Sequence, residues 1–205
     1  MTDDSWPLYL PIIIIVLIMI INALVVASKR ALDYIDRNVI KEMLEDEPDN
    51  RKLKAVTAFL SKPSKYHYAD HAASFISIIL CFIIFNILLL SMDLSGKFPE
   101  DFGLYKDGFG ILVLFLLNLG FYIVYTALSD ILPKKLAAQS SETTGISLIG
   151  FQQVIYYLTL PLVWICKGIA NVFLKIMGKK TDVDDTYFSE DKVMSMLDRG
   201  QESGE

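Results

Sequence analysis

Positive charge is absent from the start of this sequence, and cysteine is scarce throughout it. No lysine or arginine precedes Lys29, and the chain begins with acidic residues, which excludes a cleavable signal peptide because such a peptide starts with basic residues. The two cysteines, Cys81 and Cys166, lie inside apolar runs without a spacing pattern, so neither a disulfide framework nor a cysteine metal site is expected. The net charge is −5 and the basic residues form no single patch, which argues against nucleic acid as a partner.

Charge of either sign is missing from four long stretches, each of 21 to 24 residues: 5–28, 72–92, 108–129 and 143–166. An uncharged apolar run of about 18 or more residues is typical of a transmembrane helix, because about 20 helical residues cover the hydrocarbon core of a bilayer. The sequence therefore predicts an all-α membrane protein whose main partner is the lipid bilayer.

The basic residues also predict an orientation, since lysine and arginine in short loops stay on the cytoplasmic side. Nine of the 19 lie between the first and second apolar runs, two lie between the second and third, and eight follow the third. This pattern predicts three transmembrane helices at about 8–28, 70–92 and 108–132. It places the N-terminus outside and the C-terminus in the cytoplasm of a multi-pass protein of the cell (inner) membrane.

The fourth apolar run fits this pattern poorly. If it crossed the membrane, Lys167 and Lys175 would lie outside, and Pro161 would interrupt the helix. We therefore expect two short re-entrant or juxtamembrane helices within 145–177 that enter or follow the inner leaflet, with a fourth transmembrane helix as the alternative. Residues 1–180 form the predicted transmembrane domain.

Two segments outside the apolar runs are also predicted to be helical. Apolar residues recur at helical spacing on both sides of Pro48-Asp49-Asn50, which predicts a cytoplasmic helical hairpin. Residues 181–205 are acidic, with Ser189 as a possible N-cap and Gly200 as a C-cap. This acidic cytoplasmic tail is interpreted as the start of a regulatory region that the chain lacks.

Polar residues are few inside the predicted transmembrane helices, where they usually mark a transport pathway or a bond between helices. The polar residues of the first two helices include Ser28, Asp70, His71 and Asn86, and the candidate ligands among them are Asn22, Ser74 and Ser77. Ser74 and Ser77 are three residues apart and so lie on one helical face. The alternative for each serine is a hydrogen bond back to a carbonyl of its own helix.

The end of the third predicted helix gives the strongest candidate. Asp130 and Ser129 come shortly before Pro133, which has no backbone N–H and therefore frees the carbonyl of Ser129. A carboxylate, a hydroxyl and a free carbonyl are ligands suited to a hard cation such as Mg²⁺. Together with Asn22, Ser74 and Ser77, they predict a metal site beside a broken helix. The alternative is that Asp130 is an interfacial acid paired with Lys134.

The only two histidines, His67 and His71, are four residues apart with Asp70 between them. This spacing is similar to the His-x-x-Glu-His motif of some zinc hydrolases, with aspartate in place of glutamate. No third ligand is apparent, so an intramembrane zinc hydrolase is the least favoured function and no enzyme activity is expected.

Several segments together resemble the transmembrane domain of the CorC/CNNM (cyclin-M) magnesium transporter family. Lys62-Pro63-Ser64-Lys65-Tyr66 is similar to the exit of that family's cytoplasmic hairpin, and Pro161-Leu162-Val163-Trp164 to its juxtamembrane region. Asp130-Ile131-Leu132-Pro133-Lys134 is the most specific match, to the family pattern Glu-Ile-x-Pro-Lys. The resemblance covers about residues 8–204.

The resemblance implies transport of a divalent cation, with Mg²⁺ as the transported ion and Na⁺ entry as the driving force. It also implies a homodimer and cytoplasmic CBS regulatory domains, which are absent from this chain. Three departures from the family pattern keep an alternative open. Ile18-Met19-Ile20-Ile21, followed by Asn22 as the only polar residue, stands for a Ser-x-x-Glu-like polar patch in the first helix, Ala73-Ser74 stands for Gly-Asn, and Ser129-Asp130 for Gly-Glu. That alternative is a membrane scaffold or regulatory subunit of the same fold that does not transport.

Overall fold

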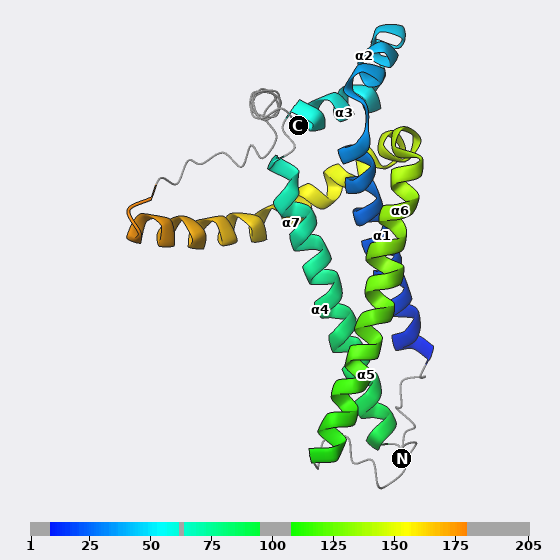
Figure 1. Ribbon diagram of the computed structural model, residues 1–205, viewed down its shortest axis with the longest axis vertical. Helices are drawn as coiled ribbons and strands as arrows, with labels where there is room; N and C mark the ends of the chain where they lie inside the picture. The colour runs from blue at the N-terminus through cyan, green and yellow to red at the C-terminus, as the bar shows by residue number, and fades with distance from the viewer. Residues whose placement is uncertain (1–8, 62–63, 95–107, 180–205) are drawn as a thin grey trace, which may run out of the picture.

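The computed structural model describes residues 9–61, 64–94 and 108–179, and every regular element in these ranges is a helix (Figure 1). The all-α prediction is confirmed for this part of the chain. The predicted acidic tail at 181–205 lies outside the described residues.

Three long helical stretches run side by side along the longest dimension of the molecule (Figure 1). They are α1 (Tyr9–Tyr34), α4 (Ser64–Leu94) and the continuous stretch made by α5 (Gly108–Thr126), η2 (Ala127–Ile131) and α6 (Leu132–Gln139). Most of their large apolar side chains lie on the surface of the molecule. Such a surface is stable in lipid and not in water, which agrees with the predicted transmembrane helices.

A fourth helix, α7, changes the predicted count. Four helices in the described part of the chain are long and apolar enough to cross a membrane, where the sequence predicts three. The expected two short pieces at 145–177 form one continuous helix, α7 (Ser141–Ile176), with Pro161 inside it. Proline removes a single backbone donor, and the remaining hydrogen bonds of a long apolar helix keep it intact where no water competes.

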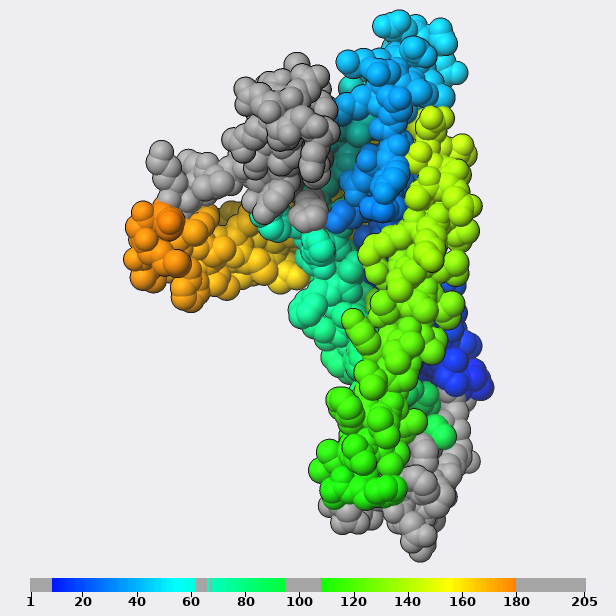
Figure 2. Space-filling model, in the orientation of Figure 1, coloured from blue at the N-terminus to red at the C-terminus, as the bar shows by residue number. Residues whose placement is uncertain are grey.

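The direction of α7 differs from that of the other long helices. In Figure 1 it runs across the bundle near the end that carries α2 and α3, and in Figure 2 its second half projects from the side. The projecting half is exposed almost everywhere, including Trp164, Ile169 and Phe173. The first half is anchored, since Gly145, Ile149, Gln152 and Ile155 are buried.

The predicted helical hairpin is confirmed as α2 (Arg37–Asp46) and α3 (Arg51–Ser61). Asp36 caps α2, because its side chain accepts a hydrogen bond of 2.8 Å from the backbone N–H of Asn38. Asn50 caps α3 in the same way, accepting from the N–H of Lys52 at 3.0 Å. Each cap satisfies a donor that the first helical turn leaves free, so the sequence fixes where both helices begin.

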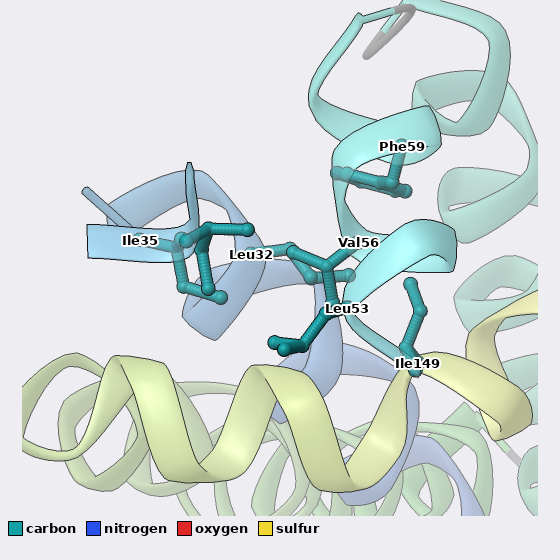
Figure 3. Close-up of a cluster of buried hydrophobic side chains, with 7 residues drawn as sticks. Leu32, Ile35, Leu53, Val56, Phe59 and Ile149 are labelled. Carbon is teal, nitrogen blue, oxygen red and sulfur yellow. The ribbon is translucent and has the colours of Figure 1, made fainter. Parts of the chain in front are cut away.

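The hairpin is held to the membrane helices by a hydrophobic cluster (Figure 3). Its buried members come from the end of α1, the hairpin and α7: Leu32, Ile35, Ile40, Leu53, Val56, Phe59 and Ile149. Ile35 packs so closely on the backbone of α7 that a Cβ at Gly145 would overlap its side chain. The cluster fixes α7 against α1 and thereby positions the polar residues that α7 carries.

Candidate functional site

Asn22, in the middle of α1, is the centre of a buried polar contact with η2. Its Nδ2 donates to the carbonyl oxygen of Ser129 at 3.1 Å and to the Ser129 hydroxyl at 2.9 Å. That hydroxyl donates in turn to the carbonyl oxygen of Met19, one turn earlier on α1, at 2.9 Å. The relative exposures of Asn22 and Ser129 are 2% and 1%, so both side chains are enclosed by protein.

The backbone of η2 explains why the carbonyl of Ser129 is available. Residues 127–131 form a π-helical turn, in which the N–H of Leu132 donates to the carbonyl of Ala127, five residues earlier. Pro133 has no N–H with which to satisfy the carbonyl of Ser129, and the amide of Asn22 takes that place. The predicted break at Pro133 is therefore a π turn within a continuous helix, a feature often found at functional sites.

Two buried oxygens around this contact have no hydrogen-bond partner among the described residues: Oδ1 of Asn22 and the hydroxyl of Tyr125. Tyr125 lies one turn before Ser129 and is itself buried. A buried acceptor without a donor is costly in a medium free of water. The Asn22 oxygen is therefore the atom of this region best suited to accept a ligand.

Asp130 does not join this group. Its carboxylate forms an ion pair of 2.8 Å with Lys134, one turn later, and its side chain is 34% exposed. A local ion pair with Lys134 is the alternative considered for Asp130 in the sequence. Its backbone belongs to the π turn, so the carboxylate lies one residue away from the Asn22 contact without touching it.

The serines of α4 are also separate from the Asn22 contact. The hydroxyl of Ser77 is buried and donates to the carbonyl of Ala73 in its own helix at 2.9 Å. Within the described ranges, no hydrogen bond connects Ser74 to Asn22 or Ser129. Of the five predicted ligands, the structure brings only Asn22 and Ser129 together.

The histidine motif gains no support from the geometry. His71 is exposed, and the side chain of His67 lies outside the described residues. In the described part of the chain, no group of three or more histidine, cysteine, aspartate or glutamate side chains could hold a metal ion.

A second buried polar pair joins α4 to α7, and the sequence indicated only one of its members, Asp70. Nε2 of Gln152 donates to Oδ1 of Asp70, and the relative exposures of the two residues are 0% and 3%. The other oxygens of the pair, Asp70 Oδ2 and Gln152 Oε1, are buried without a hydrogen-bond partner. Gln152 could have been singled out as a polar residue with a large amide inside an uncharged apolar run.

A third polar pair joins α4 to α5, and it shares no residue with the Asn22 contact or with the Asp70–Gln152 pair. Asn86 and Asn118 exchange hydrogen bonds of 2.9 and 3.2 Å, and each also donates to a carbonyl of its own helix. Both amides are thereby satisfied. This pair has the role of an interhelical bond rather than of a binding site.

Comparison with known proteins agrees with this architecture. The sequence is 30% identical over 92 residues to a protein of Haemophilus influenzae (strain ATCC 51907 / DSM 11121 / KW20 / Rd) named "Polyamine export protein". The aligned part is 45% of this chain and 20% of that relative, so the similarity covers a small part of the relative's length. The family described as "Cyclin M transmembrane N-terminal domain" matches residues 12–205, almost the whole sequence. The chain therefore belongs to the cyclin M transmembrane domain family.

Proposed function

We propose that this chain is the membrane domain of a transporter that moves a divalent cation, with Mg²⁺ as the transported ion and Na⁺ entry as the driving force. One observation carries the proposal: a buried amide and a buried serine meet at a π turn in the middle of the helical bundle. Family membership and the printed name of the Haemophilus relative support a transporter in general.

The chemistry of the Asn22 contact suits a hard cation. Oδ1 of Asn22 is unpartnered, and the nitrogen of the same amide contacts the hydroxyl and carbonyl oxygens of Ser129, whose hydroxyl is bonded to the carbonyl of Met19. Mg²⁺ and Na⁺ both prefer oxygen ligands. A rotation of the Asn22 amide would turn its oxygen toward Ser129 and replace the present hydrogen bonds with cation contacts.

Asp130 supplies the negative charge in this proposal. Its ion pair with Lys134 is partly exposed, so its net contribution is small and it opens at little cost. Because Asp130 belongs to the same π turn as Ser129, a local rearrangement of that turn moves the carboxylate and the Ser129 oxygens together. Alternation between the present turn and an α-helical turn is the conformational step that we assign to transport.

The orientation follows from the positive-inside rule. We propose that α1, α4 and the α5–α6 stretch cross the membrane, and that α7 follows the cytoplasmic interface. The crosswise direction of α7 and its exposed, mostly apolar second half support this assignment. The N-terminus then lies outside, and α2 and α3 lie in the cytoplasm.

Flux into proteoliposomes tests the proposal. The purified chain is reconstituted with a Mg²⁺-sensitive dye inside, and flux is measured with and without a Na⁺ gradient. We expect Asn22→Leu to abolish Mg²⁺ flux, since it removes the amide oxygen and keeps the side-chain volume. The matched control is Asn118→Leu, which removes an amide from another pair. Equal flux through both variants would refute the site, and no flux of any cation through the wild type would favour the scaffold alternative.

A polyamine is the second candidate cargo. The relative from Haemophilus carries that substrate class in its name. In addition, no cluster of three acidic, cysteine or histidine ligands exists in the described part of the chain, whereas an ammonium group can be bound by neutral oxygens and a single carboxylate. Release of a radiolabelled diamine from the same proteoliposomes tests whether a polyamine is transported. If excess diamine lowers the Mg²⁺ flux, the two cargoes use one site.

A further inference from the structure

In the buried pair formed by Asp70 and Gln152, two hydrogen-bond acceptors have no donor. In the bond that exists, the amide nitrogen of Gln152 donates to Oδ1 of Asp70. The remaining atoms of the pair, Oδ2 of Asp70 and Oε1 of Gln152, are both oxygens and both lack a partner. An ionised carboxylate beside an amide carbonyl would therefore leave two acceptors unsatisfied in a buried place.

One added proton would give both oxygens a hydrogen-bond partner. A proton on Oδ2 of Asp70 can be donated to Oε1 of Gln152, so that the carboxylic acid and the amide share two parallel hydrogen bonds in a closed ring. Every polar atom of the pair would then have a partner. Without the proton, Oδ2 and Oε1 are two oxygens from different helices that can bind a cation between them.

We propose that Asp70 and Gln152 form a second site for positive charge, occupied in this conformation by a proton that Asp70 donates to Gln152 and open to a cation once that proton has left to water. In the protonated state the ring ties α4 to α7. In the deprotonated state the charge balance is kept by a cation such as Na⁺ or an ammonium group. The proposal is independent of the Asn22 contact, which involves α1 and η2.

The surroundings of the pair favour such an exchange. Apolar side chains pack one turn further along both helices, where Ala73 and Ile155 form a buried cluster with Val25 of α1. Two charged residues of α1, Lys29 and Asp33, lie close enough to Asp70 to act on its carboxyl group. On α7, the ammonium of Lys167 lies 4.6 Å from the ring centroid of Tyr68, which is two residues before Asp70 on α4. On α4 itself, His71 follows Asp70 and is exposed.

The position of the pair gives it a mechanical consequence. α7 is fixed to the hairpin and α1 by the hydrophobic cluster around Ile149, one turn before Gln152. Opening the ring releases α4 from α7 at this point and leaves α7 attached through the cluster. A change in proton or cation occupancy is thereby converted into a change in the contact between two long helices.

The test uses the full chain in nanodiscs and measures its thermal unfolding between about pH 5 and about pH 9, a range that spans the titration of a buried carboxyl group. In the wild type, the Tm should fall as the pH rises, because the folded chain binds the proton and an unfolded chain in water releases it more readily. Asp70→Asn keeps the ring, since the asparagine amide can donate to Gln152 in place of the proton. Its Tm should fall much less across the range than the Tm of the wild type.

The matched control is Asp33→Asn, which removes the neighbouring acid of α1 and should keep the fall in Tm. Infrared spectroscopy provides a readout that does not depend on any variant folding well: a protonated carboxyl band in the wild type that disappears at high pH. The same fall in Tm in Asp70→Asn as in the wild type, or the absence of that band at low pH, would overturn the proton site.

The cation part is tested separately at the upper end of the pH range. Na⁺, Mg²⁺ or a diamine is added to the wild type and to Asp70→Asn, and the Tm is measured again. Recovery of Tm in the wild type alone supports exchange at this pair. If none of the three raises the wild-type Tm, or if the rise is equal in both proteins, the cation part is refuted.

Discussion

The hydrogen bonds of Asn22 should contribute measurably to the stability of the helical bundle. The Asn22 amide makes two donations to η2, of 3.1 and 2.9 Å, and both are buried. An interhelical hydrogen bond in a membrane protein contributes about 0.6 kcal/mol on average and at most about 1.7. We therefore expect Asn22→Ala to lower the free energy of unfolding by about 1–2 kcal/mol, since it also leaves the Ser129 carbonyl without a donor.

A double-mutant cycle isolates one of the two bonds. Ser129→Ala removes the hydroxyl that accepts from Asn22 and keeps the carbonyl. The coupling between Asn22→Ala and Ser129→Ala should therefore be about 0.6 kcal/mol, the value of a single bond. The assay is unfolding by sodium dodecyl sulfate in mixed micelles, followed by circular dichroism, with Asn118→Ala and Ser129→Ala as the uncoupled control pair.

Two results would refute this reasoning. The first is an unchanged free energy of unfolding in Asn22→Ala. This result would mean that the amide finds an equivalent partner in the unfolded state or that the contact does not form. The second is additivity of the two substitutions within about 0.3 kcal/mol, which is the usual error of independent sites.

Three other substitutions have expected outcomes in the same assay. Pro133→Ala restores a backbone donor for the Ser129 carbonyl, so it should convert the π turn to α-helix. The loss in free energy of unfolding caused by Asn22→Ala should then be smaller, and an unchanged loss would show that proline does not set the turn. Phe59→Ala should cost about 3 kcal/mol or more and make the hairpin sensitive to protease, since this ring is 3% exposed; a cost below about 1 kcal/mol would contradict its role in the cluster. Lys134→Ala should change stability by less than about 0.5 kcal/mol, because its ion pair is partly exposed; a loss above about 2 kcal/mol would indicate a buried role.

The long helices and the hairpin could be predicted because their signals are local. Uncharged runs of 20 or more residues must be helical in lipid, since the backbone has no other donors or acceptors there. The hairpin was predicted from the spacing of apolar residues and from Pro48-Asp49-Asn50, and its caps at Asp36 and Asn50 act on the residues that follow them. α7 was predicted as two pieces because Pro161 is a breaker in water, and the helix continues through it in the structure.

The candidate site was predictable only in part. Pro133 correctly indicated that the carbonyl of Ser129 is free of its own helix, because that effect depends on one missing N–H. The sequence could not indicate that Asn22 supplies the replacement donor, since the two residues are 107 positions apart. It also could not decide between two partners for Asp130, and the structure shows the local one, Lys134.

By itself, the sequence determined that this protein is a helical membrane protein with a helix disturbed at Pro133 and a helical hairpin, because each of these properties follows from residues within a few turns of one another. Only the tertiary structure decided which polar groups meet: Asn22 with Ser129, and Asp70 with Gln152. The physical reason is that in a region without water a polar side chain is satisfied by its own helix or by a neighbouring one, and a partner on another helix is found only where the two helices meet. That choice depends on how the helices cross rather than on their order in the chain.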